Sequence, residues 1–205
     1  NRHFWNEARG TYNYLVDADG GSDRQEGLGH TFALLFGIAD EAKRASVLER
    51  QTVTPAGIPC VWPTFDRYAD VENASYGRHS GTVWPHIQGF WATTALHFGR
   101  GDRFDFELRR LAQHAVRDAQ FAEIYHPETG KIYGGLQEDA RRGADRGIRL
   151  WHSCRRQTWS ATAFLRMVLM GLVGMRFEPD GVRFAPHLPP GCTRVELGNL
   201  RYRDM

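Results

Sequence analysis

Aromatic side chains beside glycine and proline are the first residues of this sequence whose types suggest a chemistry. Aromatic residues make up 12% of the 205 residues, and six of them are Trp. Sugar rings present apolar C–H faces and polar edges, so sites that bind them combine flat aromatic rings with hydrogen-bonding groups. Five aromatic residues are placed in this way, outside regular apolar patterns: Trp62, Trp84, Tyr125, Tyr133 and Trp159. The same rings also suit a hydrophobic core, and composition alone favours that interpretation.

Polar residues accompany two of these rings. Trp62 and Trp84 each precede a proline, and they are the preferred sugar platforms. Arg78 and His79 come just before an expected helix, where they could bind sugar hydroxyls. A histidine at such a position is as often structural. Gln88 lies one helical turn after Trp84 and is expected on the same helix face.

Two carboxylates lie in the glycine-rich part of the chain that follows. Glu123 ends an expected helix and enters a Tyr-His-Pro turn, so its carboxylate could project into a cavity beside Trp84, Tyr125 and Trp159. Taken alone, this pattern is typical of a solvated glutamate. Glu138, further along the same loop, could contact a substrate. The remaining acidic candidates are expected to be surface charges or helix caps: Asp23, Glu26, Asp66 and Asp70.

The composition argues against several other classes of protein. The formal net charge is +2 and no long run of Lys and Arg occurs, which disfavours a nucleic-acid partner. Cys60, Cys154 and Cys192 form no CxxC pair or zinc-type spacing, so neither a disulfide framework nor a structural metal is expected. The sequence also shows no His/Asp/Glu cluster for a catalytic metal and no phosphate loop after a strand, and we expect no cofactor.

Targeting signals are equally sparse. The longest apolar stretch, 159–175, contains Arg166 and is short for a bilayer span, so we expect no membrane partner. Nothing resembles a signal peptide. The chain is expected to lack its natural beginning, which leaves a cytoplasmic and a periplasmic or secreted location equally open.

Apolar periodicity predicts five helices, at 28–38, 41–51, 82–98, 102–122 and 158–175. Asp40 is expected to cap the second helix and Asp102 the fourth. The fifth is apolar nearly all round and should be buried. Long loops at 52–80 and 124–156 separate these helices, and loops of this length tend to be functional.

The end of the chain follows a different pattern. Residues 177–184 flank a Pro-Asp-Gly turn and predict a β-hairpin. Residues 193–197 alternate apolar and polar types, as a half-exposed strand does. We therefore expect a helical region over 1–175 and a short, incomplete β-region over 176–205.

Three segments resemble one group of enzymes, in the same order along the chain. Residues 75–85, Ser-Tyr-Gly-Arg-His-Ser-Gly-Thr-Val-Trp-Pro, resemble the loop-to-helix segment of six-hairpin glycosidases. Residues 123–130, Glu-Ile-Tyr-His-Pro-Glu-Thr-Gly, resemble the Glu-Asn-Tyr-Asn-Pro-x-Thr-Gly stretch of glycoside hydrolase family 63. Residues 157–161, Gln-Thr-Trp-Ser-Ala, are similar to the opening of that family's closing inner helix. The chain thus looks like the C-terminal part of a family 63-like enzyme.

This resemblance implies a fold and an activity. The fold would be mainly α, a partial (α/α)6 toroid of helical hairpins followed by the short C-terminal β-region. The activity would be that of an inverting O-glycosyl hydrolase acting on an oligosaccharide or glycoside, with Glu123 as general base. The general acid of such enzymes lies upstream of this chain. The implied partners are a carbohydrate and the missing N-terminal half of the same enzyme.

Some features depart from the family pattern and keep alternatives open. Ile124 and His126 replace the two Asn of the motif, and residues 139–148 resemble an insertion. A disaccharide phosphorylase of the same toroid fold would use Arg78 and His79 to cradle phosphate and would need no base. A non-catalytic carbohydrate-binding fragment is the third alternative.

Overall fold

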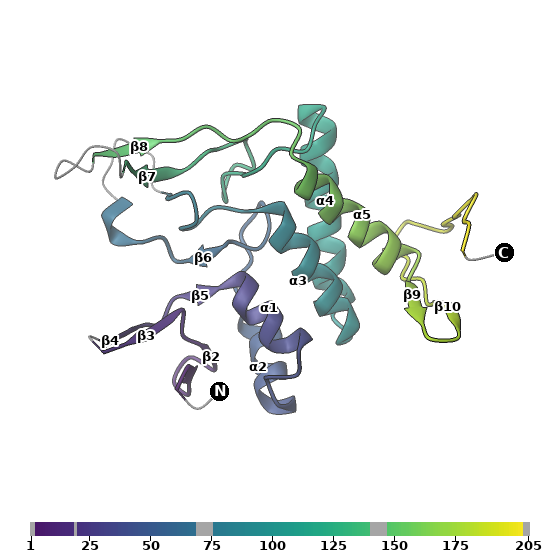
Figure 1. Ribbon diagram of the computed structural model, residues 1–205, viewed down its shortest axis with the longest axis horizontal. Helices are drawn as coiled ribbons and strands as arrows, with labels where there is room; N and C mark the ends of the chain where they lie inside the picture. The colour runs from purple at the N-terminus through teal and green to yellow at the C-terminus, as the bar shows by residue number, and fades with distance from the viewer. Residues whose placement is uncertain (1–2, 19, 69–75, 140–146, 203–205) are drawn as a thin grey trace.

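Five α-helices and five two-stranded antiparallel sheets make up the regular structure of the residues that the computed structural model describes, which are 3–18, 20–68, 76–139 and 147–202 (Figure 1). Helix α3 (Pro85–His97) packs against α1 (Gly27–Leu35), α4 (Gly101–Asp118) and α5 (Thr158–Arg166). Figure 1 shows two hairpins, β3–β4 and β7–β8, on one side of this helical group and β9–β10 on the other.

The expected mainly-α fold, a partial (α/α)6 toroid, is wrong for this structure. Small antiparallel strand pairs accompany the helices, and α1, α4 and α5 pack on α3 instead of forming a ring in the part of the chain described. Hydrophobic periodicity predicts each helix separately, whereas the arrangement of helices depends on contacts between distant segments. Most of the strands have two or three residues, which is too short for an alternating pattern to show.

The first helical hairpin is confirmed. It consists of α1 and α2 (Glu41–Arg50). A carboxylate oxygen of Glu26 accepts a hydrogen bond from the N–H of Leu28 at 3.1 Å. Asp40 accepts one from the N–H of Lys43 at 2.9 Å, so it caps α2 as predicted. These caps satisfy backbone donors that a helix start leaves free, and they fix where each helix begins.

The second hairpin, α3 and α4, is confirmed with one correction. Pro85 is the first residue of α3, where a missing N–H costs no helical hydrogen bond. The prediction that Asp102 caps α4 is wrong. Arg100 is the N-cap and makes no side-chain cap bond, while Asp102 lies in the first turn and pairs with Arg100 at 2.8 Å. Asp102 is thus a first-turn acidic residue that pairs with the N-cap arginine, and it is not itself the cap.

Helix α5 continues into a π-helical segment, Met167–Leu172. The expectation that this helix is buried on all sides is wrong, because Trp159, Leu165 and Met170 are 45%, 54% and 40% exposed. One side of the helix packs on α3 and α4. The other side is bare among the described residues and borders a groove.

Four antiparallel strand pairs lie where the sequence predicted no strands: β1 (Trp5–Asn6) with β2 (Thr11–Tyr12), β3 (Leu15–Asp17) with β4 (Gly20–Ser22), β5 (Gln25–Glu26) with β6 (Val61–Trp62), and β7 (Leu136–Glu138) with β8 (Ile148–Leu150). A 3-10 turn at Asp66–Tyr68 follows β6. The C-terminal hairpin of β9 (Met175–Glu178) and β10 (Gly181–Phe184) is confirmed. The strand predicted at 193–197 is wrong, since that segment pairs with no described strand.

Two hydrophobic clusters form the core. The first lies among α1, α2 and α3 and includes Leu34, Val47 and Trp91. The second lies among α3, α4 and α5 and includes Phe104 and Met167. Because α3 contributes to both clusters, the loops at its N-terminal end are held at a fixed place. No helix in the described ranges has the length and apolar character that a membrane crossing requires.

Candidate active site

The loop before α3 is held in place by β7. The N–H of Arg78 donates to the carbonyl of Leu136 at 2.8 Å, and the N–H of Leu136 donates to the carbonyl of Tyr76 at 2.9 Å. Gly135 lies directly against this loop with φ of +85°, and a Cβ there would be 2.4 Å from the Cα of Arg78. Glycine is thus required both for the backbone conformation and for the close approach.

Glu123 lies in a loop and not at a helix end, which corrects the sequence prediction. Helix α4 stops at Asp118 because Ala119 adopts a left-handed conformation, with φ of 50°. The backbone N–H of Glu123 then donates to the carbonyl of Cys154 at 3.1 Å, and the N–H of Ile124 donates to the hydroxyl of Ser153 at 3.1 Å. Two segments far apart in the sequence therefore fix the position of Glu123.

The carboxylate of Glu123 forms an ion pair inside the protein. The Nη2 of Arg78 donates to Oε1 and to Oε2, both at 2.9 Å, and the backbone N–H of Cys154 donates to Oε2 at 3.1 Å. The side chains of Arg78 and Glu123 are 17% and 5% exposed. All three contacts come from donors, which is the arrangement that an ionised, acceptor-only carboxylate requires.

The Trp84 side chain contacts Arg78 and so helps to hold this ion pair in place. Its indole Nε1–H donates to the carbonyl of Arg78 at 2.7 Å, and the guanidinium of Arg78 lies 5.5 Å from the centre of the ring. His79 stacks on the same ring at 4.6 Å with an interplanar angle of 15°. Trp84 is only 4% exposed. The expectation that it offers a bare face to a sugar is therefore wrong, and its ring instead positions Arg78 and His79.

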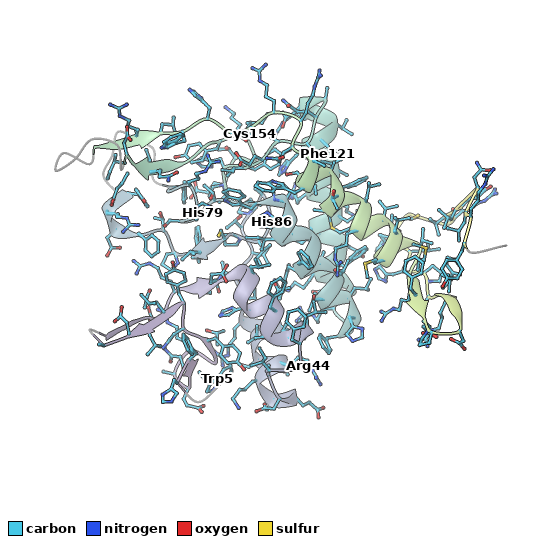
Figure 2. The ribbon with its side chains drawn as sticks, viewed as in Figure 1. Trp5, Arg44, His79, His86, Phe121 and Cys154 are labelled. Atoms are coloured by element: carbon cyan, nitrogen blue, oxygen red, sulfur yellow. The ribbon has the colours of Figure 1, made fainter. Side chains whose placement is uncertain are left out.

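A second histidine and an exposed tryptophan extend this cluster. The ring of His86 lies 5.6 Å from Trp84 and 5.6 Å from Trp159, and Trp159 lies 5.9 Å from Trp84. Burial lowers the pKa of His79, with the charge of Arg78 adding to this effect and that of Glu123 opposing it. Burial also lowers the pKa of His86, and His79 contributes. Both imidazoles are therefore neutral near pH 7. Figure 2 labels His79, His86 and Cys154 in this region.

A groove of about 740 Å³ begins beside these rings. His86 and Trp159 line its end, and it continues along the bare side of α5 past Thr162, Arg166 and Met170. Its lining is mostly apolar. The cluster of His79, Trp84, His86 and Trp159 thus lies between the buried ion pair and a surface groove.

The structure brings together five of the residues predicted for the site: Arg78, His79, Trp84, Glu123 and Trp159. Two others are fully buried elsewhere. The Tyr125 ring packs against His114 at 4.6 Å, tilted by 33°, and its hydroxyl accepts from a backbone N–H. Gln88 donates to the carboxylate of Glu107 at 2.9 Å within the core. The side chain of Gln88 therefore lies in the core between α3 and α4.

Trp62 and Glu138 also lie apart from the cluster. The Trp62 ring stacks on Tyr76 at 6.4 Å, and Tyr76 in turn bonds to Glu128. Glu138 on β7 pairs with Arg67 at 3.7 Å and is well exposed. Neither side chain has a recorded contact with Arg78 or Glu123.

The other acidic candidates have partners of their own. Asp23 pairs with Arg9 at 2.6 Å and Asp66 with Arg24 at 3.0 Å, while Glu26 caps α1. Asp70 lies outside the described residues. Within the described part of the chain, no group of three His, Cys, Asp or Glu side chains could hold a metal ion.

Two features of the cluster escaped sequence reasoning. His86 is one, although its place in the first turn of α3, two residues after Trp84, was a usable signal. The backbone N–H of Cys154 is the other. The type of a residue does not indicate where its backbone N–H donates, so only the fold could show this contact.

One comparison with known proteins gives a match. The family model described as the mannosylglycerate hydrolase MGH1-like glycoside hydrolase domain matches residues 1–160, which is well over half of the chain. No curated protein matches the chain. The match confirms the glycosidase family that the three motifs predicted, but it does not single out glycoside hydrolase family 63.

Proposed function

We propose, since the chain belongs to the mannosylglycerate hydrolase MGH1-like family of glycoside hydrolases, that it cleaves a glycosidic bond with inversion and that Glu123 is the general base. The observation that carries this proposal is the nearly buried carboxylate of Glu123, which is held by Arg78 and by the N–H of Cys154. A general base must present an ionised oxygen at a fixed position. The three donors supply that orientation.

The two carboxylate oxygens differ in a way that suits this role. In an inverting reaction the base takes a proton from water while the water attacks the anomeric carbon, and an acid protonates the leaving oxygen. Among the contacts of the described residues, Oε2 of Glu123 accepts from both Arg78 and Cys154, whereas Oε1 accepts from Arg78 alone. Each oxygen has two lone pairs. We therefore assign the attacking water to Oε1.

The surroundings favour a neutral sugar ring as the group that is bound. Trp159 offers the exposed aromatic face, and the neutral imidazoles of His79 and His86 can bond hydroxyls. Because the family is named for mannosylglycerate hydrolase, mannosylglycerate is the first substrate to test.

The phosphorylase alternative is less well supported. A phosphate site needs cationic donors that are free to bind the anion. The guanidinium of Arg78 is already paired with Glu123, and burial disfavours the charged form of His79. Hydrolysis uses the ion pair as it stands, whereas phosphorolysis would have to break it.

The test is hydrolysis of mannosylglycerate and of a panel of nitrophenyl glycosides by the full-length protein and by Glu123→Gln. The variant keeps the shape of the side chain but cannot accept a proton, so we expect kcat to fall about 1000-fold with KM little changed. Proton NMR of the first product should show the inverted anomer. Glu178→Gln is the matched control, because Glu178 is a half-buried glutamate on β9 that pairs with Arg183.

Two outcomes would count against the proposal. Near-full activity of Glu123→Gln would remove the base assignment. Turnover that requires inorganic phosphate would favour the phosphorylase.

A further inference from the structure

In the part of the chain that the structure describes, the His86 side chain packs against two aromatic rings. Its imidazole packs edge-on against Trp84, at an interplanar angle of 87°, and tilted against Trp159 at 47°. Its Nδ1 is buried and has no hydrogen-bond partner among the described residues. His79 differs, because its ring lies flat on Trp84 at an interplanar angle of 15°. Among the described residues, no hydrogen bond to Nδ1 fixes the direction in which the His86 ring presents its nitrogens.

An unpaired polar atom at this place calls for a partner. Buried polar groups in native proteins almost always have one, and leaving one without costs more than an average hydrogen bond contributes. His86 is half-buried and lines the end of the groove, so a molecule in the groove reaches the part of the ring that is not buried. A turn of the ring about its Cβ–Cγ bond would present Nδ1 on that side. A neutral imidazole has one donor and one acceptor nitrogen, which matches a hydroxyl group, itself both a donor and an acceptor.

The position of His86 connects the groove to the proposed base. Trp84 lies between them: it contacts His86 on one side and bonds to the carbonyl of Arg78 on the other. Arg78 in turn holds Glu123. The groove lining is mostly apolar, and the polar side chains that line it at this end belong to His86, Gln157 and Thr158.

We propose that His86 is a substrate-binding residue, whose imidazole hydrogen-bonds a hydroxyl of a neutral sugar ring that stacks on Trp159. This proposal rests on the proposed function, because it takes the bound molecule to be the glycoside that Glu123 acts on. It assigns hydroxyl recognition to His86 and orientation of the base to Arg78.

Two substitutions separate recognition from packing. His86→Phe keeps a ring between Trp84 and Trp159 but removes both nitrogens, so we expect the Kd for the sugar and KM to rise about 10-fold or more, with the melting temperature little changed. His86→Gln keeps a donor and an acceptor and should recover part of the lost affinity. A purely structural histidine would give the opposite order, with Phe tolerated and Gln harmful.

The experiment is calorimetric titration of the full-length protein with mannosylglycerate and with methyl mannoside, glucoside and galactoside, together with steady-state kinetics. The same titrations in the Glu123→Gln background measure binding when turnover is blocked. His97→Phe is the matched control, because His97 is on the same helix but contacts Phe98 and Arg176 at its far end. It should change neither Kd nor KM.

The results separate this inference from the proposed function. If Glu123→Gln loses turnover while His86→Phe leaves Kd and KM within two-fold of the parent, the role of His86 is wrong and the base assignment stands. If His86→Phe weakens binding while Glu123→Gln keeps its turnover, the base assignment fails and the binding role survives. Absence of binding to every sugar tested would overturn the inference.

Discussion

The guanidinium of Arg78 and the carboxylate of Glu123, 45 residues apart in the sequence, meet with Nη2 at 2.9 Å from both carboxylate oxygens. Both side chains are largely removed from solvent. When one partner of such a pair is removed, the other charge stays buried without compensation, and the loss exceeds the net stabilisation of the pair. The two residues should therefore be coupled in stability as well as in activity.

Replacing Arg78 by Met tests this coupling. Arg78→Met keeps the length of the side chain but leaves Glu123 with the N–H of Cys154 alone, and we expect the free energy of unfolding to fall by about 3 kcal/mol. With the base no longer oriented, kcat should fall about 100-fold. Urea unfolding and steady-state hydrolysis measure the two effects. Arg194→Met breaks an exposed pair with Glu196 and should cost less than about 1 kcal/mol. Equal losses in the two variants would contradict the argument.

Gly135 is expected to matter because it lies against the backbone of Arg78. A Cβ at position 135 would lie 2.4 Å from the Cα and 2.6 Å from the N of Arg78. Gly135→Ala must move that backbone and the ion pair with it, so we expect kcat/KM to fall at least about 10-fold.

The matched control is Gly37→Ala, since Gly37 also has a positive φ, +67°, but has open space around it. The free energy of unfolding of Gly37→Ala should fall only by the cost of a left-handed backbone at alanine, about 1 kcal/mol, and its kcat/KM should stay at the parental value. A Gly135→Ala protein with parental kcat/KM would show that the loop yields without disturbing Arg78.

The sequence predicted the members of this site better than their arrangement. Glu123, Arg78, His79, Trp84 and Trp159 were all candidates, because motif and residue type mark them one by one. Local pattern could not tell that Trp84 is covered by His79 and Arg78 while Trp159 is exposed. Burial of a ring depends on which distant segment packs over it.

The fold shows the same division. Apolar periodicity placed α1 to α4 within a few residues, and the Asp40 cap marked the start of α2, because those signals are local. The strand pairs β5–β6 and β7–β8 join segments that local pattern does not connect. Strand pairs of two or three residues derive their stability from the surrounding packing. They are too short for an alternation of apolar and polar residues to predict them.

The two tryptophans of the cluster should respond differently to truncation. Trp159 is 45% exposed, so Trp159→Ala should alter stability by less than about 1 kcal/mol while raising KM about 10-fold through loss of the sugar platform. Trp84 is buried and bonded to Arg78, so Trp84→Ala should cost about 3–5 kcal/mol of unfolding free energy. Thermal unfolding and kinetics of both variants check this. A stable Trp84→Ala protein would be inconsistent with the support role given to that ring.

Glu107 provides a prediction about pH and stability away from the site. Its carboxyl is fully buried on α4, where it accepts from the N–H of Ile58 at 2.9 Å and from the amide of Gln88 at 2.9 Å. Burial raises the pKa of Glu107 to about 8 from its ordinary 4.5, and the two hydrogen bonds and the charge of Arg103 oppose the shift. At neutral pH the folded chain therefore keeps a proton that the unfolded chain has lost.

Stability should consequently fall as the pH rises through this window. Between pH 4.5 and about pH 8, unfolding releases the proton of Glu107. The stabilisation that this proton gives is therefore fully present below pH 4.5 and is lost near pH 8. Between these two pH values the free energy of unfolding falls by up to about 1.4 kcal/mol per pH unit. Glu107→Gln cannot titrate, and its unfolding free energy should lack this component of the slope. Urea unfolding of both proteins at whole pH units from about 5 to 8 measures the difference. Glu41→Gln, an exposed glutamate on α2, should keep the parental slope. Parallel profiles for the parent and Glu107→Gln would mean that Glu107 is ionised in the folded protein.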